Sequence, residues 1–208
     1  MKMKIVRICI SVLLGIALAI SISACISPKV EAPDATRTTG ANYTPNEAAT
    51  FDNIVVNGES LYIGLKLNDM IAEGVTIGDL DATSIAMPEF KKMIDVEFRG
   101  VPLQMLIENS GTDGISLGET QVVQIHVKES NLSDEDTVII STVDIRTSMS
   151  VVENLLGKRD SVLCGDNFNT DSWKKEIEGK NIIAELYFTQ DSQEGVHSAT
   201  LLVQNNSN

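Results

Sequence analysis

The first 24 residues divide into three zones. Their order indicates that this segment is not part of the folded domain. Residues 1–7 carry three basic side chains and no acidic one. Residues 8–20 are almost wholly apolar, and residues 21–24 are small or weakly polar. This order of zones is the signature of a cleaved export signal. A retained transmembrane helix is the alternative, but it needs roughly 20 apolar residues, more than this stretch offers.

The end of the signal carries a more specific pattern. Ile22, Ser23, Ala24 and Cys25 are an aliphatic residue, two small residues and a cysteine, an order that resembles the bacterial lipobox. In lipoproteins with this motif, the cysteine thiol receives a diacylglycerol and the signal is cut before it. Each buried acyl CH₂ contributes about 0.8 kcal/mol, and two chains anchor stably. The resemblance implies that Cys25 begins a mature chain anchored by lipid to the cell membrane, facing outside the cytoplasm.

The three cysteines fit this interpretation. Cys9 would leave with the signal, Cys25 would carry the lipid, and Cys164 is the third. A lipidated mature chain is therefore expected to contain no intramolecular disulfide. An exported domain without a disulfide depends on its own hydrophobic core.

Residues 25–50 differ in composition from the rest of the chain. Three of the five prolines lie in this segment, together with few large apolar side chains. Such a composition does not bury enough surface to offset the entropy of ordering. We therefore expect a disordered, lipid-anchored linker, which as a flexible coil would span about 25–30 Å.

The charge of the chain excludes one class of partner. The formal net charge is −13, and removal of the signal takes away three positive charges and leaves −16. Nucleic-acid-binding proteins carry basic patches, so nucleic acid is not expected as a partner. Anionic lipid headgroups also repel such a surface, so the acyl chains would provide the attachment to the membrane.

From Phe51 onward, short apolar segments alternate with turn residues. Asn57 and Gly58 separate two apolar runs, which is the pattern of a two-residue hairpin turn. Apolar residues at helical spacing over 67–71 precede Gly74 and predict a short helix. Strands are predicted over residues 93–98, 103–109 and 121–127.

A similar order of elements follows the polar connection at residues 128–137. A strand or hairpin is predicted first, and Ser150 and Glu153 then form an S-x-x-E capping box of a helix that ends before Gly157. A hairpin formed by residues 181–189 and 196–204 completes this half.

The fold class expected from these elements is α+β. After the linker, a first module over residues 51–130 and a second over 137–205 would each contain a strand or hairpin, a short helix and an antiparallel sheet. The similarity between the halves is one of pattern rather than of individual residues.

The second half resembles the small modules of exported bacterial lipoproteins, on the segments "VDIRTSMSVVENLLGKRDSV" and "IIAELYFTQDSQEGVHSATLLV". In that family a turn and helix of the form G-M-S-x-x-x-V-x-x-x-L-G-x-P lead to an antiparallel sheet. SmpA/BamE-like outer-membrane assembly lipoproteins and tandem β-lactamase inhibitor proteins are similar in this arrangement. Thr147 and Arg159 replace the glycine and proline of the motif. The residues that fit are Met149, Ser150, Val152, Leu156 and Gly157.

The first half resembles uncharacterised lipoproteins of Gram-positive bacteria, on "SLYIGLKLNDMIAEGV" through "VVQIHV". Together the resemblances cover most of residues 51–205. They imply an architecture of tandem modules, and they transfer no catalytic residue to this chain.

A calcium-loop pattern lies in the segment "NFNTDSWKKEIE". Its positions 1, 3, 5 and 12 are Asn167, Asn169, Asp171 and Glu178, which are oxygen-bearing side chains of the kind that bind Ca²⁺. The usual first aspartate is an asparagine here, and Ser172 replaces the central glycine. These departures remove charge and the sharp turn, so no metal site is assigned and calcium is kept as an alternative.

The same segment contains a possible nucleophile. Ser172 and Lys175 form S-x-x-K, the nucleophile motif of serine β-lactamases and penicillin-binding proteins, without the companion S-D-N and K-T-G motifs. Trp173 lies between polar neighbours and is a candidate partner contact, because tryptophan is enriched in interface hot spots. His126 and His197 have no partner at zinc spacing, and we expect them to be exposed on strand faces.

No complete catalytic constellation is present in the sequence. The function expected is therefore that of a lipid-anchored binding or scaffold module at the cell envelope, without catalysis or cofactor, whose partner is an envelope or surface protein. The alternative is an envelope hydrolase that uses Ser172 and Lys175, or a calcium-dependent protein that uses residues 167–178.

Overall fold

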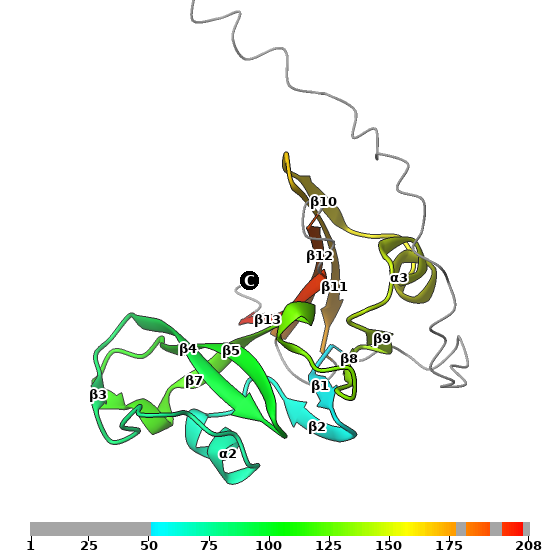
Figure 1. Cartoon of the computed structure of the whole chain (residues 1–208). Helices are drawn as coiled ribbons and strands as arrows, with labels where there is room; N and C mark the ends of the chain where they lie inside the picture. Colours follow the sequence, from blue (N-terminus) through cyan, green and yellow to red (C-terminus); the bar gives the residue numbers. More distant parts are fainter. Residues whose placement is uncertain (1–50, 178–181, 192–196, 206–208) are drawn as a thin grey trace, which may run out of the picture. The chain divides into compact units, whose positions relative to one another are not determined.

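The structure is a computed structural model that describes residues 51–177, 182–191 and 197–205 (Figure 1). The expected signal peptide, Cys25 and the expected linker lie outside the described residues. Within the described ranges, no helix is long and apolar enough to cross a membrane.

Most of the described chain is β-strand, so the expected α+β class is wrong: the fold is nearly all-β. Residues 161–176 form two strands, β10 and β11, where the sequence predicted none. Polar side chains lie on both faces of this segment, so it shows no alternation of apolar and polar residues that would predict a strand. The helical elements are short: α2 (Leu67–Ala72), α3 (Met149–Leu156), and the 3-10 turns η1 (Leu117–Glu119) and η2 (Glu129–Asn131).

The strands form one large and two small antiparallel sheets. In spatial order, the large sheet contains β10 (Ser161–Cys164), β11 (Phe168–Glu176), β12 (Ile182–Asp191), β13 (His197–Asn205), β7 (Gln121–Lys128), β5 (Val101–Asn109) and β4 (Phe90–Phe98). The second sheet contains β2 (Glu59–Tyr62), β1 (Asn53–Val56), β8 (Val138–Ile140) and β9 (Val143–Asp144). The third pairs β3 (Ile85–Ala86) with β6 (Ile115–Ser116).

Several local predictions are confirmed. The β1–β2 hairpin turns at Asn57 and Gly58, whose φ angles of 49° and 86° are those of a primed two-residue turn. Helices α2 and α3 end near Gly74 and Gly157, with φ angles of 102° and 83°. The capping box is wrong, because the residue that precedes α3 is Ser148 and no side-chain capping bond forms there.

Strands of the two expected modules share both larger sheets. β7 of the first half pairs with β13 of the second half in the seven-stranded sheet. β1 of the first half pairs with β8 of the second half in the four-stranded sheet. The halves are therefore joined by backbone hydrogen bonds in both layers.

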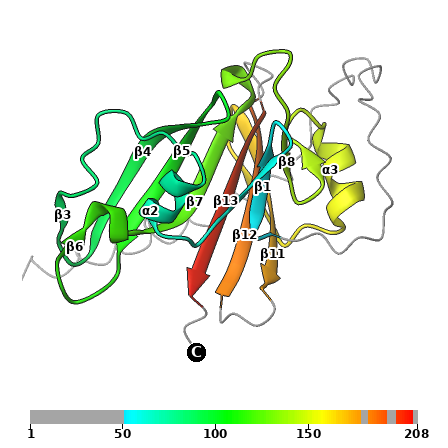
Figure 2. The same cartoon turned by 90° about the horizontal axis from the view of Figure 1, so that it is seen from below.

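The core lies between the two larger sheets. The four-stranded sheet and helices α2 and α3 lie on one face of the seven-stranded sheet (Figures 1 and 2). Alternate residues of β5 point into this layer, which gives the strand its period of two. The buried apolar side chains that β5 contributes are Val101, Leu103, Met105 and Ile107.

Candidate functional site

The other face of the seven-stranded sheet has no helix or second sheet packed on it within the described part of the chain (Figures 1 and 2). We call it the open face; it carries Leu106, Gln124 and Leu202, which strand pairing places side by side. It also carries His126, which lies between Gln104 and Thr200. Sheets that are covered on one side normally expose polar side chains on the other. Here the open face also carries leucines, so it differs from an ordinary solvated sheet face.

The sheet splits in the middle of the open face. β7 and β13 pair from Lys128 with Ser198 to Gln124 with Leu202. Beyond these pairs β7 and β13 diverge, as Figure 2 shows. β13 continues to Asn205 beside β12, so the large sheet opens into two parts at one end.

The diverging end of β7 is held by another segment of the chain. The N–H of Gly64 donates to the carbonyl of Val122 at 3.0 Å, and the N–H of Val122 donates to the carbonyl of Leu65 at 2.9 Å. The register between β5 and β7 shifts beside Leu106, and the adjacent Val122 and Val123 are both buried. A β-bulge bends a strand and increases its twist. The split is therefore built into the backbone.

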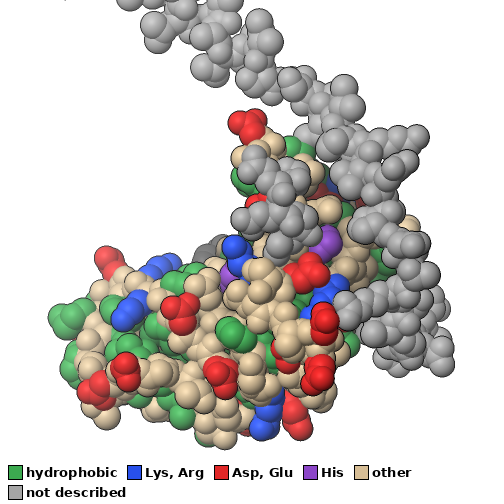
Figure 3. Space-filling view, viewed as in Figure 1, with side chains coloured by type: hydrophobic (Ala, Val, Ile, Leu, Met, Phe, Trp, Pro, Cys, Tyr) green, Lys and Arg blue, Asp and Glu red, His purple; other side chains and the backbone are tan. Residues whose placement is uncertain are grey.

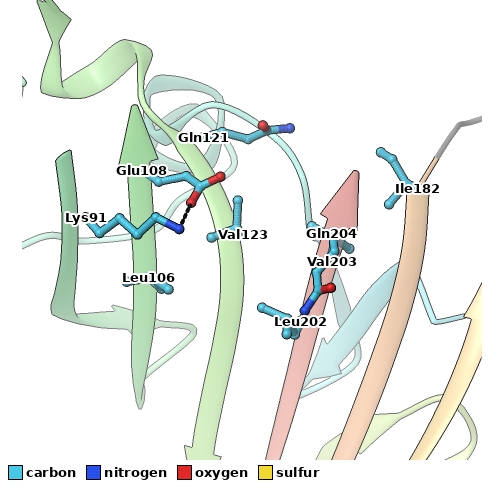
Figure 4. A pocket seen from close by; sticks show the side chains of 9 residues that line it. All are labelled: Lys91, Leu106, Glu108, Gln121, Val123, Ile182, Leu202, Val203 and Gln204. Carbon is cyan, nitrogen blue, oxygen red and sulfur yellow. Dashed lines mark ion pairs between the residues drawn. The ribbon is translucent and has the colours of Figure 1, made fainter. Parts of the chain in front are cut away.

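A hollow of about 290 Å³ lies at this split (Figure 4). Side chains from β4, β5 and β7 line one side of it, and side chains from β12 and β13 line the other. Lys91 Nζ lies 2.9 Å from Glu108 Oε2 and forms an ion pair at its border. The other lining residues are Leu106, Gln121, Val123, Ile182, Leu202, Val203 and Gln204.

Burial controls the ionisation of groups on the open face. His126 Nδ1 lies 2.8 Å from Thr200 Oγ1 across the β7–β13 pair. Desolvation first, and the charge of Lys128 second, lower the pKa of His126, which favours the neutral imidazole. Burial, with a hydrogen bond to Glu185, raises the pKa of Tyr187 to about 12. Both groups are therefore uncharged at neutral pH, and neither adds charge to the open face.

The structure does not bring Ser172 and Lys175 together. Both lie on β11, where residues three apart point to opposite faces of the sheet. The S-x-x-K pattern places both side chains together only on a helix, where residues three apart share a face. Ser172 Oγ lies 2.7 Å from Ser161 Oγ, whereas Lys175 Nζ lies 5.3 Å from the ring centroid of Phe51.

The calcium-loop pattern is also not assembled in the described residues. Asn169 and Asp171 lie in the extended strand β11 rather than in a loop, and Asn167 precedes that strand. Arg159 Nη1 donates to Asp171 Oδ2 at 2.7 Å. The carboxylate that a calcium ion would need is therefore already paired with a guanidinium. Glu178 lies outside the described residues. Among the residues described, no three His, Cys, Asp or Glu side chains could hold a metal ion together.

Two other sequence candidates are buried. Trp173 is only 3% exposed, and its Nε1–H donates to the carbonyl of Gly157 at 3.0 Å, so this indole joins α3 to β11 and is not on the surface. The expectation that His197 is exposed is wrong: it is 8% exposed, and its Nδ1 lies 3.0 Å from Glu129 Oε2. His126 is half-buried.

Cys164 lies at the end of β10, where it is exposed. It is disulfide-bonded in the structure. The expectation that a lipidated mature chain contains no intramolecular disulfide stays a prediction, and Cys164 is a suitable control position in a test of lipidation at Cys25.

Sequence reasoning missed the hollow because its two sides come from strands that are distant along the chain. One local signal was available: the consecutive buried Val122 and Val123 break the strict alternation of β7. Such a break is typical of a bulge.

Comparisons with protein-family models, curated proteins and solved structures find no match to this chain.

Proposed function

We propose that this protein is a lipid-anchored binding module of the bacterial cell envelope, without catalysis, which contacts an envelope or surface protein through its open face. Lipidation at Cys25 would hold it to the membrane, and residues 25–50 would act as its linker. The observation that carries the proposal is the hollow at the split of the seven-stranded sheet.

The lining of the hollow favours a protein partner. Apolar side chains at its centre, such as Leu106, Val123 and Leu202, have polar groups beside them, such as the Lys91–Glu108 ion pair. Protein interfaces combine an apolar centre with a polar rim in this way. At about 290 Å³, the hollow lies at the lower limit of about 300–1,000 Å³ for small-molecule pockets.

The charge of the surface also restricts the partner. Acidic side chains are scattered over the view in Figure 3 rather than gathered at one place, in keeping with the net charge of −13. Such a surface disfavours nucleic acid and anionic lipid. The contact would therefore depend on the shape and apolar content of the hollow more than on long-range attraction.

Lipidation is tested with Cys25→Ser in the full chain, expressed in a bacterium that is fed a palmitate analogue. We expect the wild type to be labelled and membrane-bound, and the variant to be an unlabelled precursor. Cys164→Ser is the matched control and should remain labelled. Labelling of Cys25→Ser would refute lipidation at this residue. An unlabelled wild type would refute it as well.

The open face is tested with a photo-crosslinking residue introduced in living cells at Gln204, an exposed residue that lines the hollow. Val151 of α3, which is also exposed, is the control position. We expect a discrete adduct from position 204 that is absent at position 151. No adduct at position 204, or the same adduct at both positions, would refute the open face as the contact surface.

A further inference from the structure

The turn between β1 and β2 contains a chemically reactive pair of residues. Asn57 and Gly58 form the only Asn-Gly pair in the sequence. In such a pair the backbone nitrogen of the glycine attacks the side-chain carbonyl carbon of the asparagine, because the glycine has no Cβ to hinder the approach. Apart from its chain neighbours, no described atom lies within 4 Å of the position that a Cβ of Gly58 would occupy. The attacking nitrogen of this turn is therefore uncrowded.

Two other segments of the chain hold the side-chain amide of Asn57. Its Nδ2 donates to the carbonyl of Arg99 at 3.1 Å and to Asp136 Oδ1 at 3.0 Å. Its Oδ1 accepts from the N–H of Thr137 at 2.8 Å. The amide thus joins the β1–β2 turn to the β4–β5 turn and to the segment that precedes β8.

The reaction of this pair changes a neutral amide into an acid. The Gly58 nitrogen loses its proton and forms a bond to Asn57 Cγ, while the bond from Cγ to Nδ2 breaks and that nitrogen leaves as ammonia. Water then opens the five-membered imide and leaves an aspartate or an isoaspartate at position 57. Water is the only other reactant.

The contacts of Asn57 affect both the reactant and the product. Both hydrogen bonds from Nδ2 are lost when this nitrogen leaves, so they stabilise the reactant and slow the reaction. Hydrogen bonds from Asn57 first, and from Ser133 second, lower the pKa of Asp136, so its carboxylate is ionised at neutral pH. In the product, a second carboxylate replaces the donor that faces Asp136 Oδ1. The two like charges repel each other, and the carbonyl of Arg99 also loses its donor.

We propose that Asn57 is a site of spontaneous deamidation whose rate is controlled by local opening of the β1–β2 turn, and that the reaction prevents this turn from closing again. The site lies beside the pairing of β1 with β8, which joins the two halves of the chain. Deamidation would therefore loosen the four-stranded sheet. The open face belongs to the seven-stranded sheet, so this proposal and the proposed function can fail independently.

Peptide mapping by mass spectrometry of the full chain, in excess detergent at mildly alkaline pH, follows the conversion of amide to acid. We expect Asn57 to convert in the urea-unfolded wild type and at least about tenfold more slowly in the folded protein, because its hydrogen bonds must open first. Asp136→Ala removes one acceptor and should accelerate the folded-state reaction about three- to tenfold. Glu135→Ala, at an exposed neighbour, is the matched control and should leave the rate unchanged.

Met105→Ala separates local opening from complete unfolding. This substitution removes a buried side chain from the middle of β5 and lowers the stability of the whole domain. If local opening of the turn controls the reaction, the rate should change by less than about twofold. A larger acceleration by Met105→Ala than by Asp136→Ala would overturn the proposal.

Asn57→Asp tests the effect of the product. Amide hydrogen exchange in residues 53–56 and 137–140 should be at least about fivefold faster than in the wild type, because the turn no longer closes. Adding Asp136→Asn removes the like-charged pair and should restore part of the protection. Unchanged exchange in Asn57→Asp, or no recovery in the double variant, would overturn the proposal. The same holds if Asn57 of the unfolded wild type does not convert.

Discussion

The two halves of the seven-stranded sheet are stabilised in different ways. In the first half, formed by β4, β5 and β7, the strands bury apolar side chains, apart from Asn109 at the end of β5. In the second half, formed by β10 to β13, polar side chains are buried together with partners. Arg159 binds one of them, Ser161 contacts another, and Lys174 and Glu129 contact the remaining two. These buried polar residues are Asp171, Ser172, Glu185 and His197.

This difference explains why the strands β10 and β11 of the second half were not predicted, whereas the strands of the first half were. A strand that buries one apolar face can be predicted from the alternation of apolar and polar residues, as in β5 from Val101 to Ile107. A strand that buries Asp171 and Ser172 has no such signature, because its burial depends on partners supplied by other segments. Buried polar groups are stable only when they are paired, and sequence pattern does not reveal the pairing.

The largest effect is expected in the apolar half. Met105→Ala removes a side chain of β5 with 0% exposure and should lower the free energy of unfolding by about 2–5 kcal/mol, through lost burial and a residual cavity. Met93→Ala is the matched control, since Met93 is 43% exposed on the neighbouring strand, and its cost should stay within about 0.5 kcal/mol. Urea denaturation measures both. Equal costs at the two positions would show that the first half does not depend on its apolar layer.

A smaller effect is expected in the half with buried polar groups. Arg159→Ala removes the donor that lies 2.7 Å from the buried Asp171 carboxylate. An unsatisfied buried acceptor costs about 1–3 kcal/mol, and urea denaturation measures this loss. Lys158→Ala is the control and should have almost no effect, because this neighbouring side chain is exposed.

Adding Asp171→Asn sharpens the same comparison. The double variant replaces the unpaired carboxylate by a neutral amide and should recover part of the stability lost in Arg159→Ala, because burying a neutral group costs less than burying a charge. If Arg159→Ala is no more destabilising than Lys158→Ala, the second half does not depend on the pairing of its buried polar groups.

The elements predicted correctly from sequence are those fixed by local chemistry. Asn57 and Gly58 determine the β1–β2 turn, and Gly74 and Gly157 mark the ends of the helices. The β12–β13 hairpin was also predicted, because its strands alternate and follow each other in the chain.

The pairing that builds the candidate site was not predictable in this way. His126 of β7 lies beside Thr200 of β13 although the two residues are 74 positions apart. The sequence of neither strand indicates which strand it pairs with. The hollow, which depends on where this pairing stops, therefore became visible only in three dimensions. The chemistry of S-x-x-K failed for a related reason: its meaning depends on a helix, and Ser172 lies in a strand.

The smallest effect is expected where the two halves meet. Burial lowers the pKa of His126 in the folded state, so near its ordinary pKa of about 6.5 the unfolded chain binds more protons than the folded one. Stability is therefore full above about pH 6.5 and falls as the pH drops toward the folded-state pKa. His126→Gln keeps a polar side chain beside Thr200 but removes the titration, and should flatten this part of the profile. Thermal unfolding between pH 5 and 7.5, at constant ionic strength, measures the difference between the two proteins. Parallel profiles would mean that the junction between β7 and β13 does not hold the imidazole in its neutral form.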